Sequence, residues 1–239
     1  MKLAIIPARG GSKRIPRKNI KVFAGIPMLA HSVRAARTSA LFDRVIVSTD
    51  DAEIAAVARE HGAEIPFMRP SSLADDFAGT DAVILHALEW FAEQGEPVQE
   101  FCCIYATAPF VEASDLRRGL NLLRERQAAT AFSVTSYPYT IFRSLKINED
   151  GRVEMYWPDN FPKRSQDLPE AYHDAGQFYW GNTGRYLQER RLFSSNSVPV
   201  VINRSRVQDI DTPEDWDRAE AMYRLLHADK PAMMEGANA

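Results

Sequence analysis

The chain has 239 residues, 45% of them hydrophobic, and a net charge of −3 at pH 7. This length suits one globular domain with room for a small insertion. The nearly balanced charge gives no overall attraction to nucleic acid or to anionic membranes, and no apolar stretch reaches the roughly 20 residues of a membrane span. Cys102 and Cys103 are adjacent in an apolar run, which indicates reduced, buried thiols. We therefore expect a cytoplasmic protein without nucleic-acid or membrane partners.

The first apolar run, residues 3–6, has the length of a buried strand and leads into a Gly-Gly loop. Six Lys and Arg residues lie within residues 9–21, and no acidic residue precedes Asp43. Backbone N–H groups of such a loop can surround phosphate oxygens while cations neutralise them. We expect Gly10 and Gly11 to provide positive φ angles and room for the ligand. The alternative is a solvated basic face or a non-specific nucleic-acid patch.

Helices and strands alternate along most of the chain. We expect helices at residues 28–40, 50–61, 80–94, 114–126, 183–192 and 213–227. Between them we expect strands at residues 44–48, 64–67, 101–105, 130–135, 177–180 and 198–202. The expected helix N-caps are Asp50, Thr80, Ser114 and Thr212. The predicted fold class is therefore α/β, with a mainly parallel sheet that helices cover on both faces.

Residues 138–176 interrupt this alternation. Two alternating runs flank Asn-Glu-Asp-Gly at residues 148–151, a pattern that predicts a β-hairpin. We interpret residues 138–176 as an insertion into a domain of residues 1–228, followed by a disordered tail at 229–239. The insertion is too short for its own core yet carries aromatic side chains, which favours packing on a second subunit. We therefore expect the insertion to contact another subunit.

Asp209 and Asp211 are two positions apart in an extended segment, so both carboxylates point to one face while Ile210 points into the core. Two such oxygen ligands suit Mg²⁺, which proteins usually hold with one or two carboxylates plus phosphate oxygens. Without other signals, a structural interpretation is equally favoured, in which Asp211 solvates the start of the next helix and Asp209 pairs with an arginine. Beside a phosphate loop, the metal interpretation is favoured.

Further polar residues lie outside the loop. Arg69 follows the expected strand at 64–67, where its guanidinium could reach a triphosphate or a sugar carboxylate, although a surface arginine is the alternative. His173 and Asp174 could form a catalytic pair, but adjacent residues of this kind more often share structural hydrogen bonds. Together with Arg164, Gln166 and Gln177, they favour substrate recognition over acid–base chemistry.

These motifs resemble those of the CMP-sugar synthetases, which activate nonulosonic and related acid sugars with CTP. The resemblance covers about residues 1–227 and rests on residues 6–13, 15–19, 48–50, 69–70, 107–109 and 209–213. It implies a Rossmann-like nucleotidyltransferase fold and a homodimer formed through an arm such as residues 138–176. It also implies that Arg9, Ser12 and Lys13 hold the triphosphate of CTP, that Lys18 supports it and that Asn19 contacts the cytidine. The remaining residues implied at the CTP site are Ala8, Gly10, Gly11 and Arg69, and the implied Mg²⁺ ligands are Asp209 and Asp211.

Two stretches bear on the acid sugar. Sialic acid enzymes carry Gln-Pro-Thr-Ser-Pro where this chain has Tyr-Ala-Thr-Ala-Pro at 105–109, and residues 164–179 resemble the pseudaminic acid cytidylyltransferases. The implied sugar-binding residues are Tyr105, Thr107, Arg164, Gln166, His173, Asp174, Gln177 and Tyr179.

The resemblance implies that the anomeric hydroxyl of pseudaminic acid attacks the α-phosphorus of CTP, giving CMP-pseudaminic acid and pyrophosphate. Arg9 and Lys13 would stabilise the departing pyrophosphate. The alternatives are the same reaction on sialic, legionaminic or 3-deoxy-octulosonic acid, or, more remotely, a nucleotide-binding subunit without catalytic activity.

Overall fold

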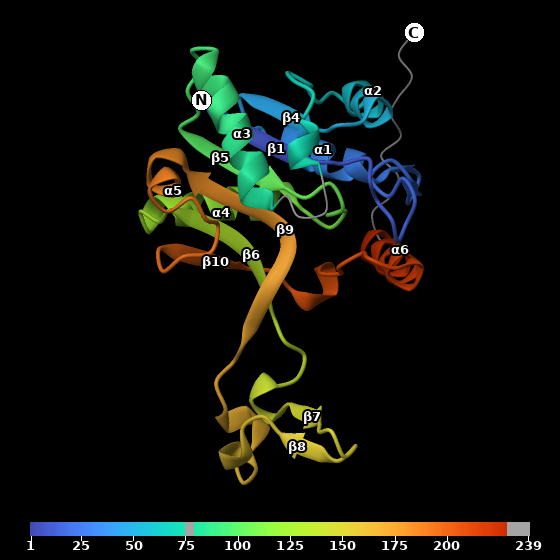
Figure 1. Cartoon of the computed structure of the whole chain (residues 1–239), viewed down its shortest axis with the longest axis vertical. Coiled ribbons are helices and arrows are strands. Elements are labelled where there is room, and N and C mark those ends of the chain that lie inside the picture. The colour runs from blue at the N-terminus through green and yellow to red at the C-terminus, as the bar shows by residue number, and fades with distance from the viewer. Residues whose placement is uncertain (75–78, 229–239) are drawn as a thin grey trace.

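The main sheet has six strands in the order β10-β6-β9-β5-β1-β4 (Figure 1). The computed structural model describes residues 1–74 and 79–228. The strands are β1 (Lys2–Pro7), β4 (Arg44–Ser48), β5 (Glu100–Ile104), β6 (Thr130–Ser136), β9 (Tyr172–Asn182) and β10 (Ser197–Val201). Neighbouring strands run parallel except at β9, which is antiparallel to both β5 and β6.

Helices cover both faces of this sheet because its strands are apolar on both sides. In β1, Ala4 and Ile6 pack into a cluster with α1 (Met28–Ser39), α2 (Ala52–Glu60) and α4 (Ala113–Glu125). Leu3 and Ile5 pack on the opposite face with α3 (Thr80–Glu93) and α5 (Thr183–Glu189). Successive strand residues point to opposite faces, so one short run supplies both cores. The predicted α/β class with a mainly parallel sheet is confirmed.

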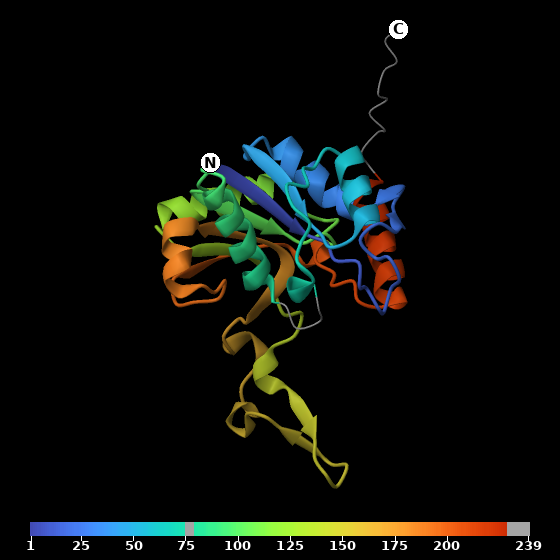
Figure 2. The same cartoon turned by 45° about the horizontal axis from the view of Figure 1, so that its top comes forward.

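A third apolar cluster attaches α6 (Pro213–His227) to the segment after β1. Ile15 and Phe23 pack there with Ile210 and Trp216. The short pair β2 (Val22–Phe23) and β3 (Ile26–Pro27) closes this segment. As a result, the basic loop at the N-terminus lies beside α6 at the other end of the chain (Figure 2).

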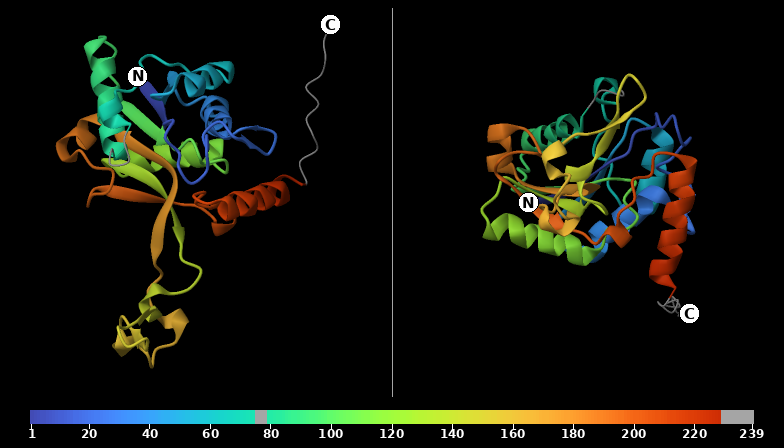
Figure 3. Two further views of the ribbon diagram at one scale, coloured as in Figure 1. Left: turned by 45° about the vertical axis from the view of Figure 1, so that its right-hand side comes forward. Right: turned by 90° about the horizontal axis from the view of Figure 1, so that it is seen from below.

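Residues between β6 and β9 form an arm that projects from the body of the molecule (Figure 3). The arm contains the antiparallel pair β7 (Leu145–Ile147) and β8 (Val153–Met155), so the hairpin predicted around residues 148–151 is present. It exposes large apolar side chains, with Tyr139 85%, Ile147 77% and Phe161 72% exposed. β9 begins at Tyr172, earlier than the expected Gln177, and forms one side of the stem of this arm.

The strand expected at 64–67 is wrong. Glu64 forms only an isolated bridge with Ile46, because Pro66 lacks the N–H that a continuing ladder needs. The helix expected to reach residue 192 ends at Glu189, where Arg190 turns into the left-handed region with φ 52°.

Three predicted helix caps are also wrong, and each polar side chain has another partner. Asp51, not Asp50, caps α2, because the Asp50 carboxylate accepts a hydrogen bond from the Gly10 N–H. Gly79 precedes α3, and the Thr80 hydroxyl bonds to Tyr105.

Ser114 lies inside α4, whose N-cap is Glu112. The predicted cap at Thr212 is confirmed: its hydroxyl accepts from the Asp215 N–H, and the Asp215 carboxylate accepts from the Thr212 N–H. The expected tail at 229–239 lies outside the described residues. Among the described helices, none combines the length and apolar character needed to cross a membrane.

Candidate active site

The basic loop after β1 is held at both of its sides. The Gly10 N–H donates to the Asp50 carboxylate over 3.0 Å, which ties the loop to the end of β4. Lys18 Nζ donates to the Ile210 carbonyl over 2.7 Å, which ties it to the segment before α6. Asn19 Nδ2 closes the loop on itself by donating to the Arg9 carbonyl over 2.9 Å.

The expected positive φ at Gly10 and Gly11 is wrong. Within this loop the left-handed residue is Arg17, with φ 54°. Gly10 is needed for another reason: a Cβ atom there would lie 2.7 Å from Asp51 Oδ2. A Cβ at Gly11 would meet no atom within 4 Å. Gly10 therefore permits close packing of the loop against Asp51 at the start of α2, and neither glycine provides a left-handed turn.

A cleft of about 530 Å³ opens between this loop, the end of β5 and the start of α3. Most of the predicted CTP residues and two predicted sugar-binding residues line it: Arg9, Gly11, Ser12, Lys13, Lys18, Asn19, Arg69, Tyr105, Thr107 and Asp211. Ala8 is buried beneath the loop, and Gly10 faces Asp50 instead of the cleft. The side chains that line the cleft are mostly cationic or polar, as a polyanionic ligand requires.

The Asp211 carboxylate lies at the edge of the cleft between cations. Arg14 contacts it at 2.9 Å and Lys18 at 3.3 Å. Partial desolvation raises the pKa of Asp209, and the negative charge of Asp211 raises it further. Ile210 between them is buried, as the alternation predicts.

The two carboxylates fit Mg²⁺ only together with a ligand. Within residues 1–74 and 79–228, no three His, Cys, Asp or Glu side chains are grouped closely enough to hold a metal ion alone. Asp209 and Asp211 would thus provide a partial donor set, and phosphate oxygens in the cleft would complete it.

Arg69 forms a buried wall of the cleft. Its side chain is almost fully buried, yet Nε and Nη2 have no hydrogen-bond partner among the described residues. One carboxylate oxygen, Asp50 Oδ1, lies 3.9 Å from Nη2. Burial lowers the pKa of Arg69, although a guanidinium stays protonated in proteins. A buried cation with unused donors is costly until a ligand supplies acceptors.

Tyr105 and Thr80 form the wall opposite the basic loop. Their hydroxyl oxygens are 2.8 Å apart. The ring of Tyr105 packs against that of Tyr179, with centroids 5.1 Å apart. Tyr179 itself does not line the cleft; its hydroxyl donates to the Asp174 carboxylate.

The other predicted sugar-binding residues lie outside this cleft. Arg164 and Gln166 belong to the arm, where Arg164 pairs with Asp167 at 2.7 Å. His173 Nδ1 contacts the carbonyl oxygen of Asp174 and not its carboxylate, so the two do not form a catalytic pair in this chain. Gln177 is buried, and its Nε2 donates to the Arg206 carbonyl.

Sequence reasoning missed several residues at the cleft. Thr80 is expected from the sequence only as a helix cap, and no site role is predicted for Val83 or Ile15, yet all three line the cleft. Arg14 belonged to the basic run but had no assigned role. The signal that could have found Thr80 is its position at the start of α3, since helix N-termini often lie at ligand sites.

Comparisons with known proteins concern the family of this chain. A family model described as cytidylyltransferase matches residues 3–209. The pseudaminic acid cytidylyltransferase of Campylobacter jejuni serotype O:2 is 42% identical over 225 residues, covering 94% of this chain and 97% of its own length. The CMP-N,N'-diacetyllegionaminic acid synthase of Legionella pneumophila is 30% identical over 231 residues, covering 93% of this chain and 96% of its own.

A solved structure supports the fold. The CMP:2-keto-3-deoxy-manno-octonic acid synthetase complexed with CTP superposes with a TM-score of 0.70 at 15% identity, covering 94% of this chain and 99% of its own. At that identity the likeness concerns the fold alone, and it agrees with the nucleotidyltransferase architecture that the resemblance implied.

Proposed function

This chain belongs to the cytidylyltransferase family, and we propose that it transfers CMP from CTP to the anomeric hydroxyl of pseudaminic acid, releasing pyrophosphate. The family chemistry is CTP-dependent nucleotidyl transfer. The observation that carries the choice of sugar is the 42% identity to a pseudaminic acid enzyme along nearly the whole of both chains. The legionaminic acid enzyme, at 30%, is more distant.

The cleft supports the assignment of roles to the CTP-binding side chains. Arg9 and Lys13 line it and neutralise the triphosphate, so that the charge developing on the leaving pyrophosphate meets preplaced cations. Arg69 offers Nε and Nη2, which have no hydrogen-bond partner in the described part of the chain, to an acceptor on CTP or on the sugar carboxylate. Catalysis then depends on positioning and charge neutralisation.

Asp209 and Asp211 are the residues we assign to Mg²⁺. When bound, the ion supplies Lewis-acid polarisation of phosphate oxygens. Lys18 keeps Asp211 at the edge of the cleft through its contacts with the carboxylate and with the Ile210 carbonyl. Because CTP is a cytoplasmic nucleotide, we place the enzyme in the cytoplasm.

We further propose a homodimer formed through the arm. Its exposed apolar side chains, including Tyr139, Ile147 and Phe161, are suited to burial against a second copy. Arg164 and Gln166 lie on this arm, away from the cleft of their own chain, so we place any sugar contact of theirs in the cleft of a second subunit. Light scattering of the wild type and of an Ile147→Asp, Phe161→Asp variant tests this; a dimer in both would contradict it.

Pyrophosphate release measured with CTP, Mg²⁺ and each acid sugar in turn tests the reaction. We expect pseudaminic acid to give the highest kcat/KM, and a preference for legionaminic, sialic or 3-deoxy-octulosonic acid would overturn the choice of sugar. Lys13→Ala should lower kcat about 100-fold. CTP binding without turnover of any sugar would favour a nucleotide-binding subunit instead.

A further inference from the structure

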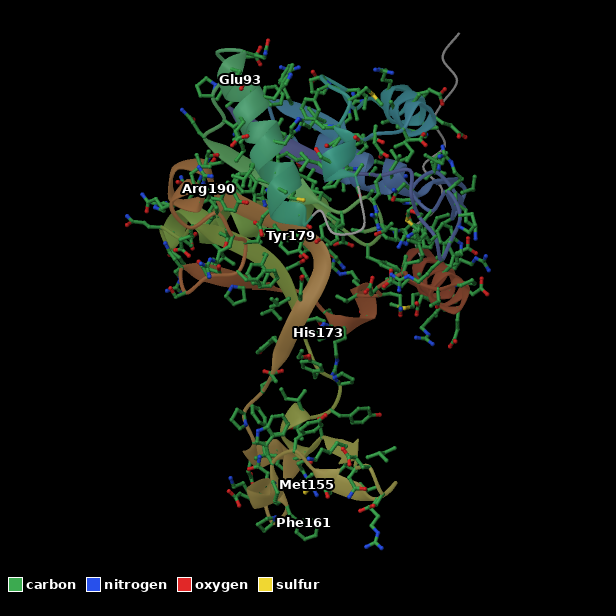
Figure 4. All side chains as sticks on the ribbon, viewed as in Figure 1. Glu93, Met155, Phe161, His173, Tyr179 and Arg190 are labelled. Atoms are coloured by element: carbon green, nitrogen blue, oxygen red, sulfur yellow. The ribbon has the colours of Figure 1, made fainter. Side chains whose placement is uncertain are left out.

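A second pocket, of about 450 Å³, lies at the base of the arm, where β6 and β10 end. Ser136, the last residue of β6, pairs with Tyr172, the neighbour of His173. Figure 4 shows His173 on the part of β9 between the arm and the body of the molecule. Three arginines are part of the lining, so we call it the arginine pocket. It is lined by Arg118, Ser136, Val201, Ile202, Asn203, Arg204 and Arg206.

The arginine pocket and the cleft lie at the same edge of the sheet. β5 and β6 both run antiparallel to β9, so they run parallel to each other, and β10 runs parallel to β6. The carboxyl ends of β5, β6 and β10 therefore lie along one edge, which is where open α/β sheets bind ligands. Among the described residues, none lines both the cleft and the arginine pocket. The pocket is thus a second candidate site, separate from that of CTP.

Arg118 and Arg204 are each fixed to the backbone through one nitrogen. Arg118 Nη2 donates to the Val201 carbonyl over 2.7 Å, and Arg204 Nη1 donates to the Tyr137 carbonyl over 3.0 Å. Within residues 1–74 and 79–228, the other two nitrogens of each guanidinium have no hydrogen-bond partner. Because the guanidinium is planar and rigid, fixing one nitrogen restricts the directions in which the remaining N–H groups point. The two side chains therefore present oriented donors to a ligand.

Asp115 fixes the third arginine and offsets part of the positive charge. This buried carboxylate accepts from Arg206 Nη1 over 2.6 Å and from Arg118 Nη2 over 3.0 Å. The Glu112 carboxylate is 3.2 Å from the same Arg206 nitrogen, but it is about half exposed and does not line the pocket. No acidic side chain is among the described residues that line the pocket. The three guanidinium groups thus retain a surplus of positive charge.

Asn203 adds an uncharged donor to the lining. Its Oδ1 accepts from the N–H and from the hydroxyl of Ser205, each over 3.0 Å, which identifies the other amide atom as nitrogen. That Nδ2 has no hydrogen-bond partner in the part of the chain that the structure describes. The Ile202 carbonyl, an acceptor on the same lining, already accepts from the Thr135 hydroxyl over 2.8 Å. The pocket therefore suits a ligand that is rich in acceptors.

We propose that the arginine pocket binds a phosphoryl group, carried either by free phosphate or by a phosphomonoester. At neutral pH such a group has close to two negative charges and three strong acceptor oxygens. It therefore matches three guanidinium groups better than a carboxylate does, which has one charge and two oxygens. The proposal goes beyond the cytidylyl transfer described above, because it concerns a ligand outside the cleft.

A ligand in this pocket also orders the segment that leads to the two aspartates. Arg204 and Arg206 bound the short 3-10 turn η5 (Arg204–Arg206), which lies between β10 and Asp209 in the chain. The Arg206 carbonyl accepts from the buried Gln177, so one side of the turn is already attached to β9. A phosphoryl group held by both arginine side chains attaches the turn at a further point and restricts residues 203–211.

The test is calorimetric titration of the full-length protein with inorganic phosphate, glycerol phosphate or acetate. CTP and Mg²⁺ are present at saturation to fill the cleft, and the sugar is omitted so that no turnover occurs. We expect at least one phosphoryl probe to bind about 10-fold or more tightly than acetate. Whether phosphate or glycerol phosphate binds more tightly identifies the free ion or the ester as the ligand. Acetate binding as tightly as both phosphoryl probes would contradict the choice of ligand.

Arg204→Gln assigns the binding to this pocket. Arg204 is exposed and donates to a single carbonyl, so we expect the variant to fold and its Kd for the phosphoryl probe to rise about 10-fold or more. Arg118→Gln should have the same effect and serves as the second variant. Arg124→Gln is the matched control, because Arg124 lies on the same helix as Arg118, is similarly exposed and pairs with Glu100. An unchanged Kd in both pocket variants, or an equal loss in Arg124→Gln, would refute the proposal.

Hydrogen exchange measures the effect on residues 203–211. With CTP bound, the phosphoryl probe should slow exchange in this segment of the wild type but not of Arg204→Gln, and unchanged exchange in the wild type would rule out the ordering of the segment. CTP binding is measured first, so an error in the proposed reaction is detected at that step. The comparison with Arg204→Gln assigns the second site whether or not CTP fills the cleft.

Discussion

The Arg17 guanidinium donates hydrogen bonds to both carboxylate oxygens of Asp51, which is also the N-cap of α2. One residue therefore starts a helix and secures the basic loop, while the same guanidinium reaches Glu53. Arg17 adopts its left-handed φ where the loop turns toward this pair. Arg17 itself does not line the cleft, and its contact anchors the loop between the cleft-lining residues Ile15 and Lys18.

Breaking this pair should affect CTP binding more than stability. Arg17 is partly exposed, so its ion pair contributes at most about 1 kcal/mol to the free energy of unfolding. In Arg17→Ala the loop loses an anchor and must be ordered by the ligand, so we expect KM for CTP to rise several-fold with a small change in Tm. Arg59→Ala, an exposed arginine on α2, is the control. An unchanged KM would show that the loop is ordered without Arg17.

Arg69 is expected to lower the stability of the ligand-free protein and to raise its affinity for the ligand. Its Nε and Nη2 are buried and have no hydrogen-bond partner in residues 1–74 and 79–228, so Arg69→Met, which keeps much of the volume, should leave the Tm of the ligand-free protein equal or higher. CTP or sugar binding should weaken by about 2 kcal/mol, the typical contribution of a charge-assisted hydrogen bond. Thermal unfolding with and without each ligand measures both effects. A large loss of Tm without ligand would mean that Arg69 supports the fold.

Because of His31, we expect the protein to lose stability in mild acid. Burial lowers its pKa to about 4, while Nε2 bonds to the Phe23 carbonyl. The unfolded chain binds the proton near pH 6.5, so stability is full above that pH and falls as the pH drops toward 4. The loss reaches about 3 kcal/mol at most.

His31→Gln, which can keep the bond to Phe23, should remove this dependence. Urea unfolding at pH 7, 6, 5 and 4.5 would measure it, with His61→Gln as the control. Parallel curves for wild type and His31→Gln across this range would contradict the assignment.

Much of the fold followed from local patterns. The apolar runs predicted β1, β4, β5, β6 and β10, and the Thr-Pro start of α6 predicted its cap. The caps at Asp50, Thr80 and Ser114 were wrong because cap propensity concerns one residue and its helix. Cap propensity takes no account of a competing hydrogen-bond partner that is distant in sequence, such as Gly10 or Tyr105.

The sequence by itself determined the α/β class, the family and the cationic character of the site, because strand and helix periodicity and the basic run from Arg9 to Lys21 are local features. The predicted roles of individual site residues stay predictions. Only the tertiary structure decided which of those residues share a cleft, that two Arg69 donors have no hydrogen-bond partner among the described residues, and that the ring of Tyr105 packs against that of Tyr179. The reason is physical: β9 returns antiparallel between β5 and β6, and this pairing alone brings Tyr179 against Tyr105.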